Sequence, residues 1–104
     1  VQPKFSAVGK LVITNHALAQ MSQHIASKVK GVARIQRTLV SIQGGNARIY
    51  IEMTGLLVPE LALAGKNIQD ALKEQISLLS GIQVEQVDVL VRKVVKHKEA
   101  EDKK

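Results

Sequence analysis

Apolar residues along this chain recur at helical spacing in two stretches. In the first, over residues 15–31, four apolar residues share one face of a helix: Leu18, Met21, Ile25 and Val29. Thr14 or Asn15 can cap the start of this helix, and Gly31 suits a left-handed position at its end. The sequence therefore predicts a first helix that runs up to Gly31.

The second stretch begins at Pro59, a residue type that suits the first turn of a helix, and runs to about Ser80. Its apolar stripe steps by three or four residues and comprises Leu61, Ala64, Ile68, Leu72, Ile76 and Leu79. The spacing predicts a long helix with this stripe buried in the core.

Strict alternation of apolar and polar residues predicts strands elsewhere. The clearest case is a hairpin over residues 37–53, because Gly44 and Gly45 tolerate the positive φ values of a tight turn. One face of its second arm is apolar throughout: Ala47, Ile49, Ile51 and Met53. Residues 9–14 predict an earlier strand, and residues 83–95 predict a last strand with alternating valines.

The element order is thus β-α-β-β-α-β, which predicts an α+β fold, a two-layer sandwich. We expect two helices packed on one face of a mainly antiparallel sheet of about four strands. The predicted organisation is an N-terminal extension at residues 1–8, a single domain at residues 9–94, and a charged tail at residues 95–104.

The alternation also predicts which side chains occupy the sheet face that the helices leave open. Ser41 and Asp88 belong to this face, together with a mixed apolar and charged group that forms our candidate interface: Leu39, Arg48, Tyr50, Glu52, Leu90 and Arg92. Mixed patches of this kind often mark association sites, so the pattern favours a homo-oligomer or a docked protein partner.

The formal net charge of +6 raises nucleic acid as a second kind of partner. Four cations near the exit of the first helix form a candidate basic patch: Lys28, Lys30, Arg34 and Arg37. However, Phe5 and Tyr50 are the chain's two aromatic residues, and base stacking normally needs two or three rings on one surface. A basic nucleic-acid-binding module is therefore the alternative function, and a regulatory accessory protein of an enzyme is a further one.

The sequence predicts no catalytic, cofactor-binding or metal-binding residues, so we expect a protein that is not an enzyme. Cysteine is absent, and His16 and His24 are eight residues apart on one predicted helix, too far to share a metal ion. We also expect no transmembrane segment, because the longest wholly apolar run is four residues, Leu61–Ala64.

Two segments resemble the alkaline-shock, or envelope stress response, protein family. "GKLVITNHALAQMSQHIASKVKGV" resembles the family's Gly-led strand, its first helix and that helix's exit. "IYIEMTGLLVPELALAGKNIQDALKEQISLLSGIQVEQVDVLV" resembles the second half, where a Gly turn and a Val-Pro-Glu step lead into a long helix and then a Val-rich strand. The resemblance covers about residues 9–94.

This resemblance implies a non-enzymatic, cytoplasmic protein of Gram-positive or related bacteria. Some members are abundant under envelope or alkaline stress, some self-assemble, and some gather at the inner side of the membrane through a membrane-anchored partner. The chain departs from the family in two ways: only "ARIQR" separates the first helix from the hairpin, and the chain is basic where many members are acidic. Both departures bear on which partners are bound.

Overall fold

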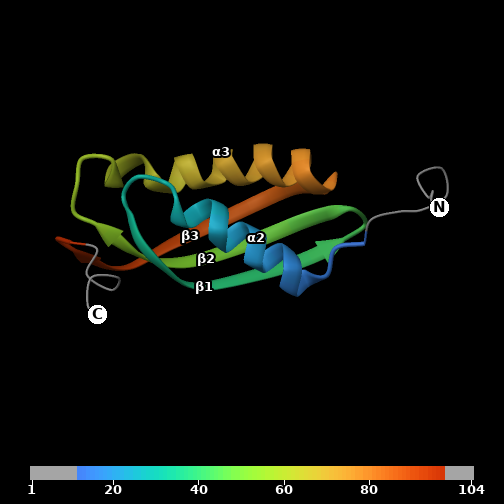
Figure 1. Ribbon diagram of the computed structural model, residues 1–104, viewed down its shortest axis with the longest axis horizontal. Helices are drawn as coiled ribbons and strands as arrows, with labels where there is room; N and C mark the ends of the chain where they lie inside the picture. The colour runs from blue at the N-terminus through green and yellow to red at the C-terminus, as the bar shows by residue number, and fades with distance from the viewer. Residues whose placement is uncertain (1–11, 98–104) are drawn as a thin grey trace, which may run out of the picture.

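The computed structural model describes residues 12–97, which form two helices and a mixed sheet of three strands (Figure 1). The elements follow in the order α2 (Asn15–Ser27), β1 (Val32–Gln43), β2 (Asn46–Leu56), α3 (Leu61–Ser80) and β3 (Gln83–Val95). The α+β class and the two predicted helices are therefore confirmed.

The sheet has the order β1-β2-β3, with β2 in the centre. β1 and β2 form the predicted antiparallel hairpin, and its turn places Gly44 and Gly45 at φ values of 58° and 82°. β3, by contrast, runs parallel to β2. The expectation of a mainly antiparallel sheet was wrong at this pair, because α3 alone connects the two strands and returns the chain to the end at which β2 began.

The predicted strand over residues 9–14 does not form in its described part, residues 12–14. Thr14 instead caps α2, since its hydroxyl accepts a hydrogen bond from the Ala17 N–H at 3.0 Å. Residues 9–11 lie outside the described residues. The described sheet consequently has three strands rather than about four.

The first helix ends at Ser27, four residues before Gly31. The N–H groups of Lys28 and Val29 donate to the carbonyls of Ile25 and Ala26, three residues back, which tightens the chain into a turn. Gly31 then adopts a φ of 98° and leads into β1. The predicted left-handed conformation of Gly31 is therefore confirmed, but this residue closes a turn that follows the helix and does not end the helix itself.

The long helix α3 buries most of the predicted stripe, with Ala64, Ile68, Leu72 and Ile76 fully inaccessible. Leu79 was also expected in this stripe, but it is 61% exposed. The buried residues step by four, and each such step rotates the stripe by about 40° around the helix. The next position in that sequence is the half-buried Ser80, so Leu79 falls outside it.

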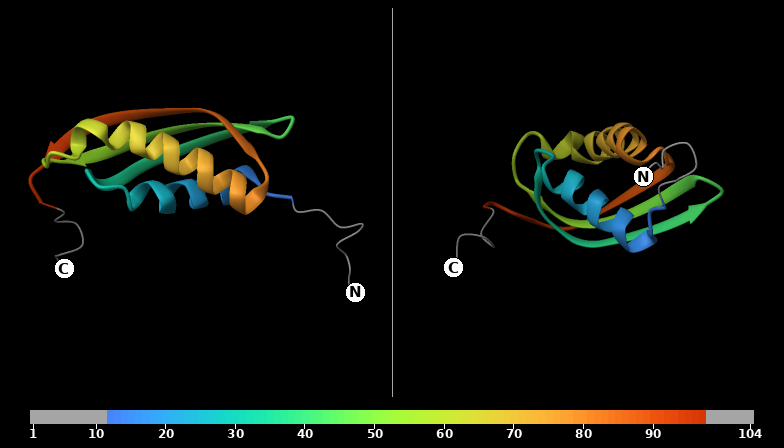
Figure 2. Two further views of the ribbon diagram at one scale, coloured as in Figure 1. Left: turned by 90° about the horizontal axis from the view of Figure 1, so that it is seen from above. Right: turned by 45° about the vertical axis from the view of Figure 1, so that its right-hand side comes forward.

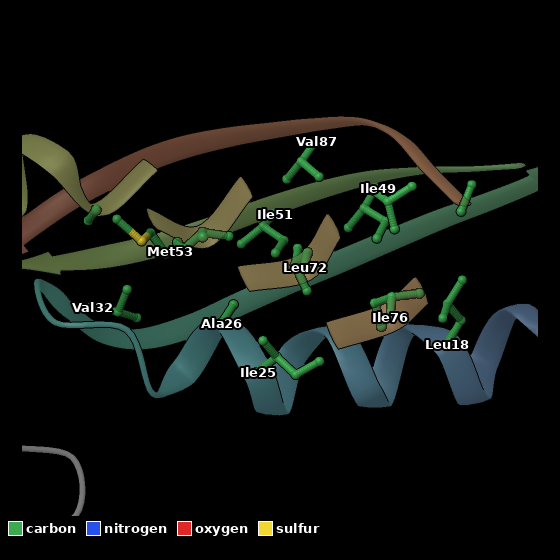
Figure 3. Close-up of a cluster of buried hydrophobic side chains, with 14 residues drawn as sticks. Leu18, Ile25, Ala26, Val32, Ile49, Ile51, Met53, Leu72, Ile76 and Val87 are labelled. Atoms are coloured by element: carbon green, nitrogen blue, oxygen red, sulfur yellow. The ribbon is translucent and has the colours of Figure 1, made fainter. Parts of the chain in front are cut away.

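Both helices cover the same face of the sheet, as the two views in Figure 2 show. α2 packs mainly on β1, α3 packs mainly on β3, and the helices contact each other. The core lies between these two layers (Figure 3) and takes side chains from all five elements, among them Leu18, Val32, Ile51, Leu72 and Val87. The opposite face of the sheet is covered by neither helix.

The last strand runs slightly past residue 94, the predicted end of the domain. β3 continues to Val95, one residue beyond that boundary, and Lys96 and His97 follow it without regular structure. The predicted extension at residues 1–8 and the rest of the tail from Lys98 lie outside the described residues.

Candidate interaction surfaces

The strand register brings the candidate interface residues together on the face that the helices leave uncovered, here called the open face. Leu39 of β1 lies opposite Tyr50 of β2, and Tyr50 lies opposite Asp88 of β3. In the next row Glu52 lies between Arg37 and Leu90. Two large apolar side chains project here, since Leu39 and Leu90 are each 46% exposed.

Glu52 is the most enclosed charged residue of this face. Its side chain is only 11% exposed, and one carboxylate oxygen accepts a hydrogen bond from an Arg92 guanidinium N–H at 3.0 Å. The other oxygen accepts a hydrogen bond from the Tyr50 hydroxyl at 2.9 Å. The carboxylate therefore fixes the positions of an aromatic and a cationic side chain from two neighbouring strands.

These contacts keep Glu52 and Tyr50 each in one protonation state near neutral pH. The hydrogen bonds from Arg92 and Tyr50 lower the pKa of Glu52, and the charges of Arg92 and Arg37 act in the same direction. The bond to Glu52 raises the pKa of the Tyr50 hydroxyl, because the proton is held between the two oxygens. Glu52 is thus ionised while Tyr50 remains a neutral donor.

Two further charged residues of the open face, Arg48 and Asp88, each have a polar partner on β3. Arg48 forms a salt bridge with Glu85 at 2.9 Å, and both side chains are well exposed. Asp88 accepts a hydrogen bond from the Gln86 amide at 2.9 Å. Such exposed pairs contribute about 0–1 kcal/mol, so they shape the surface more than they stabilise the fold.

A shallow depression of about 270 Å³ lies beside Tyr50 on this face. Its lining includes Leu39, Arg48 and Asp88, one residue from each of the three strands, together with the Tyr50 ring. The face therefore combines apolar side chains, charged groups and a recess that a side chain of another molecule can enter.

The candidate basic patch is divided between two places. Lys28, Lys30 and Arg34 line an open hollow of about 950 Å³ at the end of α2, here called the basic hollow. Arg37 does not line it and lies opposite Glu52 on the open face. A bulge lies between Ile35 and Arg37, so the partners of Arg34 and Arg37 on β2 are Thr54 and Glu52, two residues apart. A strand advances about 3.3 Å per residue, which places Arg37 roughly 7 Å further along the sheet.

Sequence periodicity did not reveal the basic hollow. Its walls come from residues 20–35, from Leu56 at the end of β2, and from the connection to α3, which contributes Val58 and Glu60. The clustering of lysine and arginine after the first helix was the one available signal. This clustering indicated the positive charge of the hollow. It could not indicate the apolar lining, because those side chains come together only in the folded chain.

Two further features of residues 12–97 bear on the chemistry of these surfaces. This part of the chain contains no group of three or more histidine, aspartate and glutamate side chains placed to hold a metal ion. Neither of its helices is long and apolar enough to cross a membrane.

A scan against protein-family models, a search of curated proteins and a search of solved structures each find no significant match to this chain. The resemblance to the alkaline-shock family therefore stays a prediction that depends on the two sequence segments.

Proposed function

We propose that this protein is a non-enzymatic interaction protein of the envelope stress response, which self-associates and docks on a membrane-anchored partner. The observation that carries the proposal is the open face, where Leu39, Tyr50 and Leu90 lie on three adjacent strands within a charged rim. The assignment to envelope stress, the cytoplasmic location near the membrane and the anchored partner depend on the family resemblance.

The open face has the properties expected of a protein interface. Tyrosine and arginine are enriched among residues that dominate binding energy, and here Tyr50 and Arg92 are already held in place by Glu52. Fixing side chains before binding reduces the entropy lost on association. The depression beside Tyr50 provides a recess, and Leu39 and Leu90 provide apolar area to bury.

Self-association can be tested by sedimentation velocity over a wide concentration range. We expect the wild-type protein to form oligomers, and we expect Tyr50→Asp to weaken association by at least about tenfold, since aromatic anchors often contribute 2 kcal/mol or more. The variant removes the ring and places a second carboxylate beside Glu52.

Leu78→Asp is the matched control, because Leu78 is 81% exposed on α3, which packs on the other face of the sheet. It should associate like the wild type, and circular dichroism should show that both variants fold. A wild-type protein that stays monomeric at millimolar concentration would contradict self-association, and an unchanged Tyr50→Asp variant would contradict the role of the open face.

The alternative function, nucleic-acid binding, is favoured by one observation. Lys28, Lys30 and Arg34 surround a single hollow and take part in no salt bridge among residues 12–97. Phosphates could neutralise these cations. A gel shift with RNA and DNA at physiological salt separates the two functions, and strong binding there would favour the alternative.

A further inference from the structure

The basic hollow has walls that the backbone holds in place. The Leu56 N–H of β2 donates a 2.8 Å hydrogen bond to the carbonyl of Gly31, which joins the end of the sheet to the turn after α2. Gly31 in turn lies against the start of α3, so closely that a Cβ built on it would be 3.0 Å from the Cα of Leu61. The turn after α2, the end of β2 and the start of α3 are thereby held together around one concave surface.

The lining of this hollow has two chemical parts. Lys28, Lys30 and Arg34 supply exposed positive charge, and Glu60 is the one acidic residue among the lining residues. The apolar part that a ligand can contact consists of partly buried side chains: Val29, Ile35, Leu56 and Val58. A ligand that satisfies both parts carries several negative charges and at least one aliphatic group.

We propose that the basic hollow binds a short acidic peptide segment of a partner protein, with one aliphatic side chain seated on the apolar lining and flanking carboxylates paired with Lys30 and Arg34. The inference rests on the proposed function, since it specifies which part of a docked partner the protein recognises. It adds a second binding surface, separate from the open face.

Two other polyanions fit the hollow less well. Single-stranded nucleic acid gains much of its binding energy by stacking bases on aromatic rings, and the lining contains no phenylalanine, tyrosine or tryptophan. An anionic membrane presents a broad surface, whereas Lys28, Lys30 and Arg34 surround a recess with apolar side chains in its lining. An acidic peptide can place both charge and an aliphatic side chain inside a recess of this size.

The test uses the full chain and a fluorescein-labelled heptapeptide, Glu-Asp-Glu-Leu-Glu-Asp-Glu, in fluorescence anisotropy titrations. Wild-type protein should bind this probe, and Lys30→Glu should weaken binding by about tenfold, because one attraction in the lining becomes a repulsion. Lys73→Glu is the matched control: Lys73 is exposed on α3 and does not line the hollow. It should change the affinity by less than about twofold, as expected for a distant screened charge.

The apolar part is tested by changing the central leucine of the peptide to serine. This change should weaken binding to the wild type several-fold and should have a smaller effect on Val58→Ser, whose hollow lacks the contact with the Val58 side chain. Equal effects of the peptide change on both proteins would contradict an aliphatic site at Val58. Thermal unfolding shows whether each variant is folded.

Three outcomes would overturn the inference: no peptide binding, equal losses in Lys30→Glu and Lys73→Glu, or tighter binding of a DNA oligonucleotide or of phosphatidylglycerol vesicles than of the peptide. Sedimentation of Lys30→Glu shows whether self-association, the core of the proposed function, is independent of peptide binding at the hollow. If peptide binding is absent while oligomers still form, the basic hollow is not a peptide site and self-association stands.

Discussion

Leu72→Ala is expected to lower the free energy of unfolding by about 3 kcal/mol, within the range found for leucine truncations in cores. Leu72 has no exposed surface and projects from α3 into the cluster between the helices and the sheet (Figure 3). Its truncation removes apolar contacts and leaves a cavity that the surrounding core side chains cannot easily fill. Urea denaturation followed by circular dichroism measures the loss.

Leu79→Ala provides the matched control on the same helix. Leu79 is 61% exposed, so the same chemical change should alter stability by no more than about 0.5 kcal/mol. Equal losses in the two variants would mean that Leu79 is also buried, as the apolar spacing alone suggests. Such a result would contradict the rotation of the buried stripe towards Ser80.

Gly31→Ala is expected to destabilise the protein by about 2–3 kcal/mol, because two costs combine. A φ of 98° is unfavourable for any residue with a Cβ, at roughly 1–3 kcal/mol. The new Cβ would also lie 3.0 Å from the Cα of Leu61 and 3.1 Å from the Cβ of Ala64, and the Leu61 Cα cannot move without displacing the start of α3. Thermal or urea unfolding measures the effect.

The same substitution at Gly65 should have the opposite sign. Gly65 lies inside α3, has no positive φ, and a Cβ there meets no atom within 4 Å apart from the neighbouring backbone of its own helix. Alanine is favoured over glycine in a helix interior by up to about 1 kcal/mol, so Gly65→Ala should be neutral or stabilising. A stable Gly31→Ala variant would show that the turn after α2 can move away from α3, which would also remove the fixed walls of the basic hollow.

Local periodicity predicted best the elements that bury one whole face and expose the other. The alternation of Ala47, Ile49, Ile51 and Met53 identified both the buried face of β2 and, by exclusion, the open-face positions of Arg48, Tyr50 and Glu52. Since a strand has a period of two, a single well-packed strand fixes the faces of the strands that pair with it. The clustering of Leu39, Tyr50 and Leu90 follows from this rule.

Features that depend on how elements pack together were predicted less well. The parallel pairing of β2 and β3 follows from the single helix between them, and the side-chain pattern of either strand does not encode it. The end of α2 at Ser27 depends on the turn in which Lys28 and Val29 bond three residues back. The basic hollow joins residues 20–35 to residues 56–60, so no local pattern contains it.

The exposed leucines give the most direct test of association through the open face. In methyl-labelled protein, NMR spectra can be compared at low and high concentration for leucines on opposite sides of the molecule. Leu39 and Leu90 lie on the open face, whereas Leu63 and Leu78 are exposed on α3. We predict that the Leu39 and Leu90 methyl signals shift or broaden as the concentration rises, while those of Leu63 and Leu78 do not. Spectra that are independent of concentration, or changes confined to Leu63 and Leu78, would contradict the account.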